Sequence, residues 1–150
     1  MCGVTGFFDI RQNKKSYDSK KIIENMTDVL KSRGPDDKGI WIDKKNNIFF
    51  GHRRLSIIEL SNLGKQPMIS HNKRFVIIFN GEIYNFLDLK KELEIENTNF
   101  LGNSDTEVLV EALAKWGIKK TLAKISGMFA FVLWDKKFKK LFLARDRFGI

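Results

Sequence analysis

The sequence predicts a single α+β domain in which sheets lie between layers of helices. The chain has 150 residues, 43% of them hydrophobic, which is enough for one domain with a real core. Its predicted elements run as strands, then helices, then strands again, an order typical of an α+β fold. Several predicted strands, such as residues 74–79, are apolar on both faces, and such strands are usually covered on both sides.

Three helices are expected, over residues 19–32, from Asn85 onward and from Ser104 to Gly117. The first has Asp18 as its N-cap and carries one apolar stripe at helical spacing. The second begins at the cap Asn85. The third begins with a capping box, a serine followed three residues later by a glutamate, at Ser104 and Glu107. These are local signals for where each helix starts.

Strands are expected where apolar and β-branched residues cluster between turn residues. The pair Asn80-Gly81 is expected to break the buried strand, because this pair is typical of turns. The last two strands are expected to form a hairpin across a basic turn. The six expected strands are residues 2–9, 39–43, 48–58, 74–79, 128–135 and 140–145.

The bulk composition indicates no nucleic acid, membrane or metal partner. The formal net charge is +9, but the lysines are dispersed along the chain, as on solvated helix faces. The single cysteine cannot form an internal disulfide, and with only His52 and His71 beside it no zinc site is expected. The longest apolar run, residues 128–134, is too short to span a bilayer, and no secretory signal is visible. A cytoplasmic location is therefore expected.

Cys2 is the first candidate for chemistry because only Met1 precedes it. A lone cysteine is usually a buried small hydrophobe, but a residue this close to the start is rarely deep in a core. Removal of Met1 would leave Cys2 with both a thiol and a free α-amine. An α-amine titrates near ~7.7–8.0 and can accept a proton at neutral pH, so this nucleophile would need no histidine.

Three further clusters complete a pattern for amide hydrolysis. Asn80-Gly81 is either a plain turn or a pair of N–H donors for a tetrahedral oxyanion. The arginines in the strand from residue 48 suit a ligand carboxylate. Glu82 and Asp105 could hold an ammonium group, although Asp105 also has a local role at a helix start. Together these residue types indicate hydrolysis of a side-chain amide on a free amino acid, with glutamine as the obvious candidate.

Eight ordered strings resemble the class II glutamine amidotransferase domain of asparagine synthetases, and they span essentially the whole chain. The resemblance implies an N-terminal-nucleophile hydrolase fold, an αββα sandwich of two antiparallel sheets between helical layers. Small departures such as Val4 and Glu59 are conservative. The strings are residues 1–6, 33–36, 51–57, 66–68, 79–85, 104–107, 127–131 and 143–147.

The resemblance also implies a role for each matching residue. The catalytic group would be Cys2, acting as nucleophile and as its own base, with an oxyanion hole made by the side chain of Asn80 and the backbone of Gly81. Glutamine would be bound through the residues Arg54 for the α-carboxylate, Glu82 and Asp105 for the α-amine, and Leu55, Ile57, Asn80 and Gly81 around the pocket.

In the family, this domain hydrolyses glutamine through a thioester and passes ammonia to a second domain. That synthetase domain uses ATP and Mg²⁺ to convert aspartate to asparagine, whereas the glutaminase domain needs no cofactor. Residues 2–150 are therefore expected to be the amidotransferase domain, incomplete at its C-terminus and without the synthetase domain. A homodimer is a possible assembly. The alternatives are an amidotransferase of a surface-polysaccharide or sugar-modifying pathway, and a non-catalytic basic nucleic-acid-binding module.

Overall fold

A computed structural model describes residues 2–10 and 18–149, and it consists of two antiparallel sheets flanked by helices. The three-stranded sheet has the order β1-β3-β2, and the four-stranded sheet has the order β4-β5-β6-β7. Met1 and Ile150 lie outside the described residues. The strands are β1(Gly3–Phe8), β2(Asp37–Asp43), β3(Ile48–Arg54), β4(Met68–Ile69), β5(Phe75–Ile83), β6(Gly127–Asp135) and β7(Lys140–Arg145).

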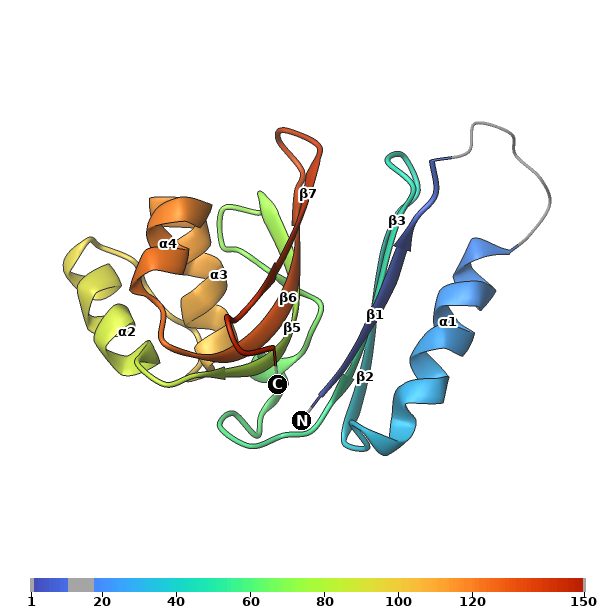
Figure 1. Cartoon of the computed structure of the whole chain (residues 1–150), viewed down its shortest axis with the longest axis horizontal. Helices are drawn as coiled ribbons and strands as arrows, with labels where there is room; N and C mark the ends of the chain where they lie inside the picture. The colour runs from blue at the N-terminus through green and yellow to red at the C-terminus, as the bar shows by residue number, and fades with distance from the viewer. Residues whose placement is uncertain (1, 11–17, 150) are drawn as a thin grey trace.

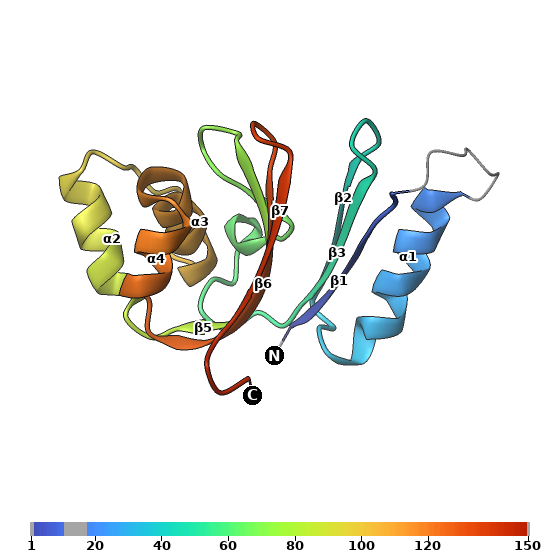
Figure 2. The same cartoon turned by 45° about the horizontal axis from the view of Figure 1, so that its top comes forward.

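The helices lie on the two outer faces, so the layers run helix, sheet, sheet, helices. Figure 1 shows α1 on the outer face of the three-stranded sheet and the other helices on the far side of the four-stranded sheet, and Figure 2 agrees. Two apolar clusters hold the layers together, one between the sheets and one between β5–β6 and the helices. The predicted α+β layering is confirmed. The helices are α1(Ser19–Val29), α2(Phe86–Ile95), α3(Asp105–Trp116) and α4(Ile118–Lys124).

The first predicted helix forms as expected. Helix α1 continues as a short 3-10 helix over Leu30–Ser32, so the two together span the predicted range. The Asp18 carboxylate accepts hydrogen bonds from the backbone N–H groups of Lys20 and Lys21 at 3.0 and 3.2 Å. The cap therefore satisfies two of the N–H groups that a helix start leaves unpaired.

Two strand ends differ from the prediction. Strand β5 does not break at Asn80-Gly81 but continues to Ile83, with Asn80 opposite Ala130 in β6. Pairing along the whole of β6 overrides the turn preference of this dipeptide. Strand β3 ends at Arg54, not at residue 58, and the following residues form a loop.

Two helix starts also differ in detail. Asn85 occupies the N-cap position of α2, but its side chain bonds Lys124 O and Ser126 N and caps nothing. At α3, Ser104 caps Glu107 N as predicted, at 3.1 Å. The Glu107 carboxylate reaches back to the N–H groups of residues 101 and 102 and not to Ser104, so only half of the capping box forms. Helix α4 and the two-residue strand β4 were not predicted.

Candidate active site

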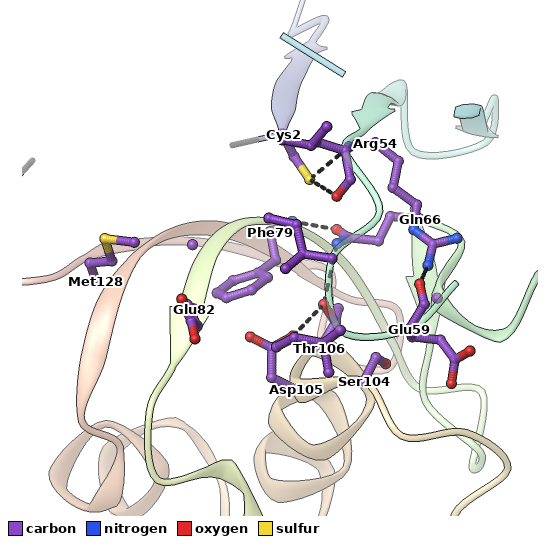
Figure 3. Close-up of a pocket in the computed structure, with 15 residues that line it drawn as sticks. Cys2, Arg54, Glu59, Gln66, Phe79, Glu82, Ser104, Asp105, Thr106 and Met128 are labelled. Carbon is purple, nitrogen blue, oxygen red and sulfur yellow. Dashed lines mark hydrogen bonds between the residues drawn. The ribbon is translucent and has the colours of Figure 1, made fainter. Parts of the chain in front are cut away.

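A pocket lies at the end of the sandwich where β1 begins and β3 ends (Figure 3). Antiparallel pairing creates this meeting point, because Gly3 of β1 is opposite Arg53 of β3. Loops after β3, the second half of β5 and the start of α3 complete the wall. The lining residues are Cys2, Arg54, Leu55, Ile57, Ile58, Glu59, Gly64, Gln66, Phe79, Gly81, Glu82, Ser104, Asp105, Thr106 and Met128.

Cys2 places its sulfur on the pocket wall, held by the loop that follows β3. The Leu55 N–H lies 3.5 Å from Cys2 Sγ, and Sγ lies 3.8 Å from Leu55 O. The Cys2 carbonyl oxygen accepts a hydrogen bond from Arg33 Nε at 3.2 Å. Both the side chain and the backbone of Cys2 are therefore fixed by residues distant in sequence, and the thiol is half-buried.

Arg54 is buried in the wall but keeps donors free for a ligand. Its Nη1 donates to Ser61 O at 2.9 Å, and its Nη2 donates to Glu59 O. A guanidinium has five N–H donors, so these two bonds leave three without a hydrogen-bond partner among residues 2–10 and 18–149. Gly64 packs against the guanidinium, where a Cβ would lie 2.7 Å from Arg54 Cζ. The arginine is thus a preorganised cation at one side of the pocket.

Glu59 fixes the loop that surrounds Arg54. Its carboxylate accepts hydrogen bonds from Ser61 N at 2.9 Å and from Asn103 N at 3.0 Å. These hydrogen bonds, those of Ser61 first, lower the pKa of Glu59 to about 2. The ionised side chain therefore joins the loop after β3 to the segment that precedes α3.

Asp105 supplies a buried carboxylate on the side opposite Cys2 (Figure 3). It is the first residue of α3 and is 6% exposed. Its Oδ2 accepts from Ile83 N at 3.1 Å, and its Oδ1 accepts from the Thr106 hydroxyl at 3.4 Å. Burial raises the pKa of Asp105, and the nearby charge of Glu82 adds to this increase.

Three other predicted binding residues, Glu82, Leu55 and Ile57, also line this pocket. Glu82 is exposed, and Leu55 and Ile57 lie in the loop after β3, with Ile57 71% exposed. The pocket therefore has a cation at one side and two carboxylates at the other. That charge pattern complements an amino-acid zwitterion.

Gly81 lines the pocket at a position that only glycine fits. Its φ is +155°, and a Cβ there would collide with Met128 O and lie 2.6 Å from Phe129 Cα. Its neighbour Asn80 is not among the lining residues. The Asn80 Oδ1 is one of two buried side-chain polar atoms without a partner in the described part of the chain. An orphan of this kind is rare in folded proteins and calls for an explanation.

One edge of β5 runs beyond the strand that covers it. Strand β4 pairs only with Val76 and Ile77. Backbone groups of alternate residues face the same edge of an antiparallel strand. The N–H groups of Phe79, Gly81 and Ile83 therefore follow that of Ile77 on an edge without a strand partner.

Side chains occupy two of these three positions. Phe79 N donates to Gln66 Oε1 at 2.7 Å, and Ile83 N donates to Asp105 Oδ2 at 3.1 Å. No side chain or loop in residues 2–10 and 18–149 bonds the Gly81 N–H on this edge. An unpaired backbone donor thus lies between two paired ones, at the pocket wall.

Several pocket residues had no role in the sequence prediction. Gln66 belongs to one of the matched strings, Gln66-Pro67-Met68. Its side chain bonds Phe79 N in β5, a contact between distant residues that the sequence does not reveal. A buried glutamine, 6% exposed, is unusual enough to mark a structural or functional role.

No group of three or more His, Cys, Asp or Glu side chains in the described ranges is placed to hold a metal ion. None of the described helices is long and apolar enough to cross a membrane.

Comparison with known proteins assigns the family. The protein-family model for the glutamine amidotransferase domain matches residues 1–150 of the sequence. The chain belongs to this family. Asparagine synthetase (glutamine-hydrolyzing) 3 of Bacillus subtilis is 41% identical over all of this chain and 24% of its own length. Asparagine synthetase (glutamine-hydrolyzing) 1 of the same organism is also 41% identical, over all of this chain and 23% of its length.

The fold of this glutamine amidotransferase domain is that of an N-terminal-nucleophile hydrolase. Glutamine phosphoribosylpyrophosphate amidotransferase of B. subtilis, solved with ADP and GMP, superposes with a TM-score of 0.56 at 26% identity. The match covers 67% of this chain and 23% of that one. The predicted αββα sandwich is thereby confirmed. The chain spans about a quarter of the length of the B. subtilis asparagine synthetases.

Proposed function

We propose that this domain hydrolyses L-glutamine to glutamate and ammonia, with the thiol of Cys2 as the nucleophile. The observation that carries the proposal is the shared pocket: Cys2, Arg54, Gly81, Glu82 and Asp105 come from four separate segments and line one cavity. The names of the relatives give the same reaction, because those synthetases are glutamine-hydrolysing. Met1 lies outside the described residues, and its removal is part of the proposal.

The proposed reaction has two halves. The α-amine of mature Cys2 takes the thiol proton, and the sulfur attacks the side-chain amide carbon of glutamine. The C–N bond breaks as that proton passes to the leaving nitrogen, so ammonia departs and a glutamyl thioester remains. Water then adds to the thioester, the C–S bond breaks, and glutamate and the thiol are regenerated.

Binding of the substrate would use the two charged sides of the pocket. The free donors of Arg54 would hold the α-carboxylate, a group that a guanidinium fork binds in two places. Asp105 and Glu82 would hold the α-ammonium, and Leu55 and Ile57 would line the wall. This places the side-chain amide of glutamine toward Cys2.

The tetrahedral oxyanion would be stabilised by Gly81 and Asn80. Within the part of the chain that the structure describes, the Gly81 N–H has no partner on the open edge of β5, and the Asn80 Oδ1 is buried without one. The first observation supports a donor held ready for a ligand, whereas Asn80 Oδ1 is an acceptor, so the donor from that side chain would be its Nδ2. Preorganised donors of this kind often contribute the largest single share of catalysis.

In the whole enzyme, we propose that the ammonia passes to a synthetase domain that uses ATP and Mg²⁺ to convert aspartate to asparagine in the cytoplasm. The relatives at 41% identity carry that name, which favours aspartate over an acceptor in a sugar or polysaccharide pathway. No cofactor is assigned to the domain itself. A homodimer and a C-terminal continuation of the domain are further parts of this proposal.

Release of glutamate and ammonia from glutamine by the purified chain tests the proposal. We expect the two products in equal amounts, with no requirement for ATP or a metal ion. A chain that released neither product but bound nucleic acid with strong salt dependence would instead be the basic binding module.

Asp105→Asn is expected to raise KM for glutamine by about 10- to 100-fold, because a charged hydrogen bond to the ammonium contributes roughly 1.5–3 kcal/mol. Burial raises the pKa of Asp105, so its carboxyl is protonated at a higher pH than an ordinary aspartate. KM of the wild type should therefore rise as the pH falls through that pKa, whereas KM of the variant should stay flat. Steady-state kinetics between pH 4 and pH 8 would measure this.

Stability provides the control for this substitution. Because the pKa is raised on folding, ionised Asp105 opposes folding at neutral pH, and its neutral isostere should not lower the free energy of unfolding. Glu82→Gln should have a smaller effect on KM, since Glu82 is exposed and its charge is screened. Equal KM values for Asp105→Asn and the wild type at every pH would contradict the assigned role.

A further inference from the structure

Gln66 joins the two parts of the site that are proposed to act on opposite ends of the substrate. Gln66 precedes Pro67, and the peptide bond between the two residues is cis. The Gln66 side chain forms part of the pocket wall beside β5 (Figure 3). Its Oε1 accepts from Phe79 N at 2.7 Å, and its Nε2 donates to Thr106 Oγ1 at 3.3 Å. One amide thereby holds both a strand and the first turn of α3.

These bonds continue into a closed circuit. The Thr106 hydroxyl donates to Asp105 Oδ1 at 3.4 Å, and Asp105 Oδ2 accepts from Ile83 N at 3.1 Å. The circuit thus leaves β5 at Phe79 and returns to it at Ile83. We call this set, Phe79–Gln66–Thr106–Asp105–Ile83, the Gln66 circuit. Gln66, Thr106 and Asp105 are 6%, 4% and 6% exposed, so water competes little for its bonds.

Gly81 lies at the centre of the strand segment that the Gln66 circuit spans. The Phe79 carbonyl is held as well, by His52 Nε2 at 3.1 Å. Burial lowers the pKa of His52 to about 4, so the ring is neutral at physiological pH and Nε2 donates this bond as N–H. Both backbone groups of Phe79 are therefore fixed, two residues before the free Gly81 N–H.

We propose that Gln66 is a positioning residue for glutamine hydrolysis: it sets the distance between the Gly81 oxyanion donor and the Asp105 ammonium site. This inference rests on the proposed function. Glutamine is held by its α-ammonium at Asp105 and reacts at its side-chain carbonyl near Gly81. A shift of one site relative to the other would misalign the carbonyl with the donor and with Cys2.

The alternative is that Gln66 has only a structural role and satisfies the hydrogen bonds of buried polar groups. Both readings predict some loss of stability on substitution, so stability does not separate them. They differ in what happens to the tetrahedral state. Misalignment weakens binding of a tetrahedral adduct far more than binding of the product glutamate, because only the adduct places an oxyanion against Gly81.

Glutamate γ-semialdehyde is the probe for the tetrahedral state. The Cys2 sulfur adds to its aldehyde carbon and the C=O π bond breaks, which gives a hemithioacetal. Its oxygen takes the oxyanion position, either as an alkoxide or as a hydroxyl that carries the former thiol proton. The inhibition constant of glutamate divided by that of the aldehyde, here called the inhibition ratio, reports how strongly the adduct is stabilised. The ratio cancels general changes in substrate affinity.

Gln66→Met keeps the length of the side chain and removes both of its hydrogen bonds. We expect kcat to fall about 10- to 100-fold and the inhibition ratio to fall by the same factor, with glutamate affinity within about threefold of wild type. Thr106→Val breaks the circuit without touching β5 and should act in the same direction, whereas Thr106→Ser should restore both quantities. Lys65→Met, an exposed neighbour, is the matched control and should change neither.

The proposal is overturned if both Gln66→Met and Thr106→Val leave the inhibition ratio unchanged, which includes the case in which they weaken binding of the aldehyde and of glutamate by the same factor. Thr106→Val carries the test alone if Gln66→Met does not fold. A wild-type chain that released no glutamate would refute the proposed function itself, which is a separate result from an unchanged ratio in an active enzyme.

Discussion

Cys2→Ala is expected to lower kcat for glutamine hydrolysis by on the order of 10⁴-fold or more, because no other side chain can form the thioester. The chain contains a single cysteine, so no second thiol could substitute. Release of glutamate measured by a coupled assay would follow the loss. Alanine is also small, so Met1 should still be removed and the α-amine kept.

Binding separates a chemical defect from a folding defect in this variant. Cys2→Ala should retain glutamine affinity within about threefold by calorimetry, because Arg54 and Asp105 are proposed to make the charged contacts. Cys2→Ser retains a hydroxyl and the amine, and should keep only a trace of activity. Hydrolysis at the wild-type rate by Cys2→Ala would show that another group is the nucleophile.

Asn80→Asp is expected to lower kcat by about 10²- to 10³-fold, the usual loss when one oxyanion donor is removed. The substitution preserves shape but replaces the amide N–H donor with an acceptor, which also repels the developing negative charge. KM should change little, since the donor acts in the transition state more than in the ground state. Steady-state kinetics with glutamine would measure both constants.

Asn80→Ala provides the comparison for this substitution. It removes the donor without adding charge, and it also removes the buried, unpaired Oδ1. We therefore expect a smaller fall in kcat than for Asn80→Asp, together with an unchanged or raised melting temperature. A fall in kcat that was accompanied by an equal rise in KM would assign Asn80 to substrate binding instead.

The elements predicted best from sequence were those with local signals that tertiary contacts reinforce. Asp18 caps α1 because its carboxylate needs only the N–H groups two and three residues ahead, those of Lys20 and Lys21. The last hairpin followed from two apolar runs around a basic turn, and β7 begins and ends as predicted. The break at Asn80-Gly81 was wrong because β6 pairs along β5 through this dipeptide, and no local signal contains that pairing.

The candidate site divides in the same way. Sequence strings suggested Cys2, Arg54 and Asp105 together, and the structure places all three at one pocket. Gln66 and Thr106 could not be assigned from sequence. Strand β4 covers only Val76 and Ile77 of β5, so Phe79 N is left for the Gln66 side chain, which in turn bonds Thr106. A short covering strand leaves backbone donors that only a folded structure can match with side chains.

In the proposed mechanism, the sulfur of a processed, amino-terminal Cys2 carries the glutamyl group during turnover. The intact mass of the chain, measured after rapid mixing with glutamine and an acid quench, would detect this covalent intermediate. We predict a chain that lacks Met1 and carries one glutamyl group, lost on treatment with hydroxylamine and absent in Cys2→Ala. An active chain that retains Met1, or one whose adduct maps to any other residue, would show that amino-terminal Cys2 is not the nucleophile.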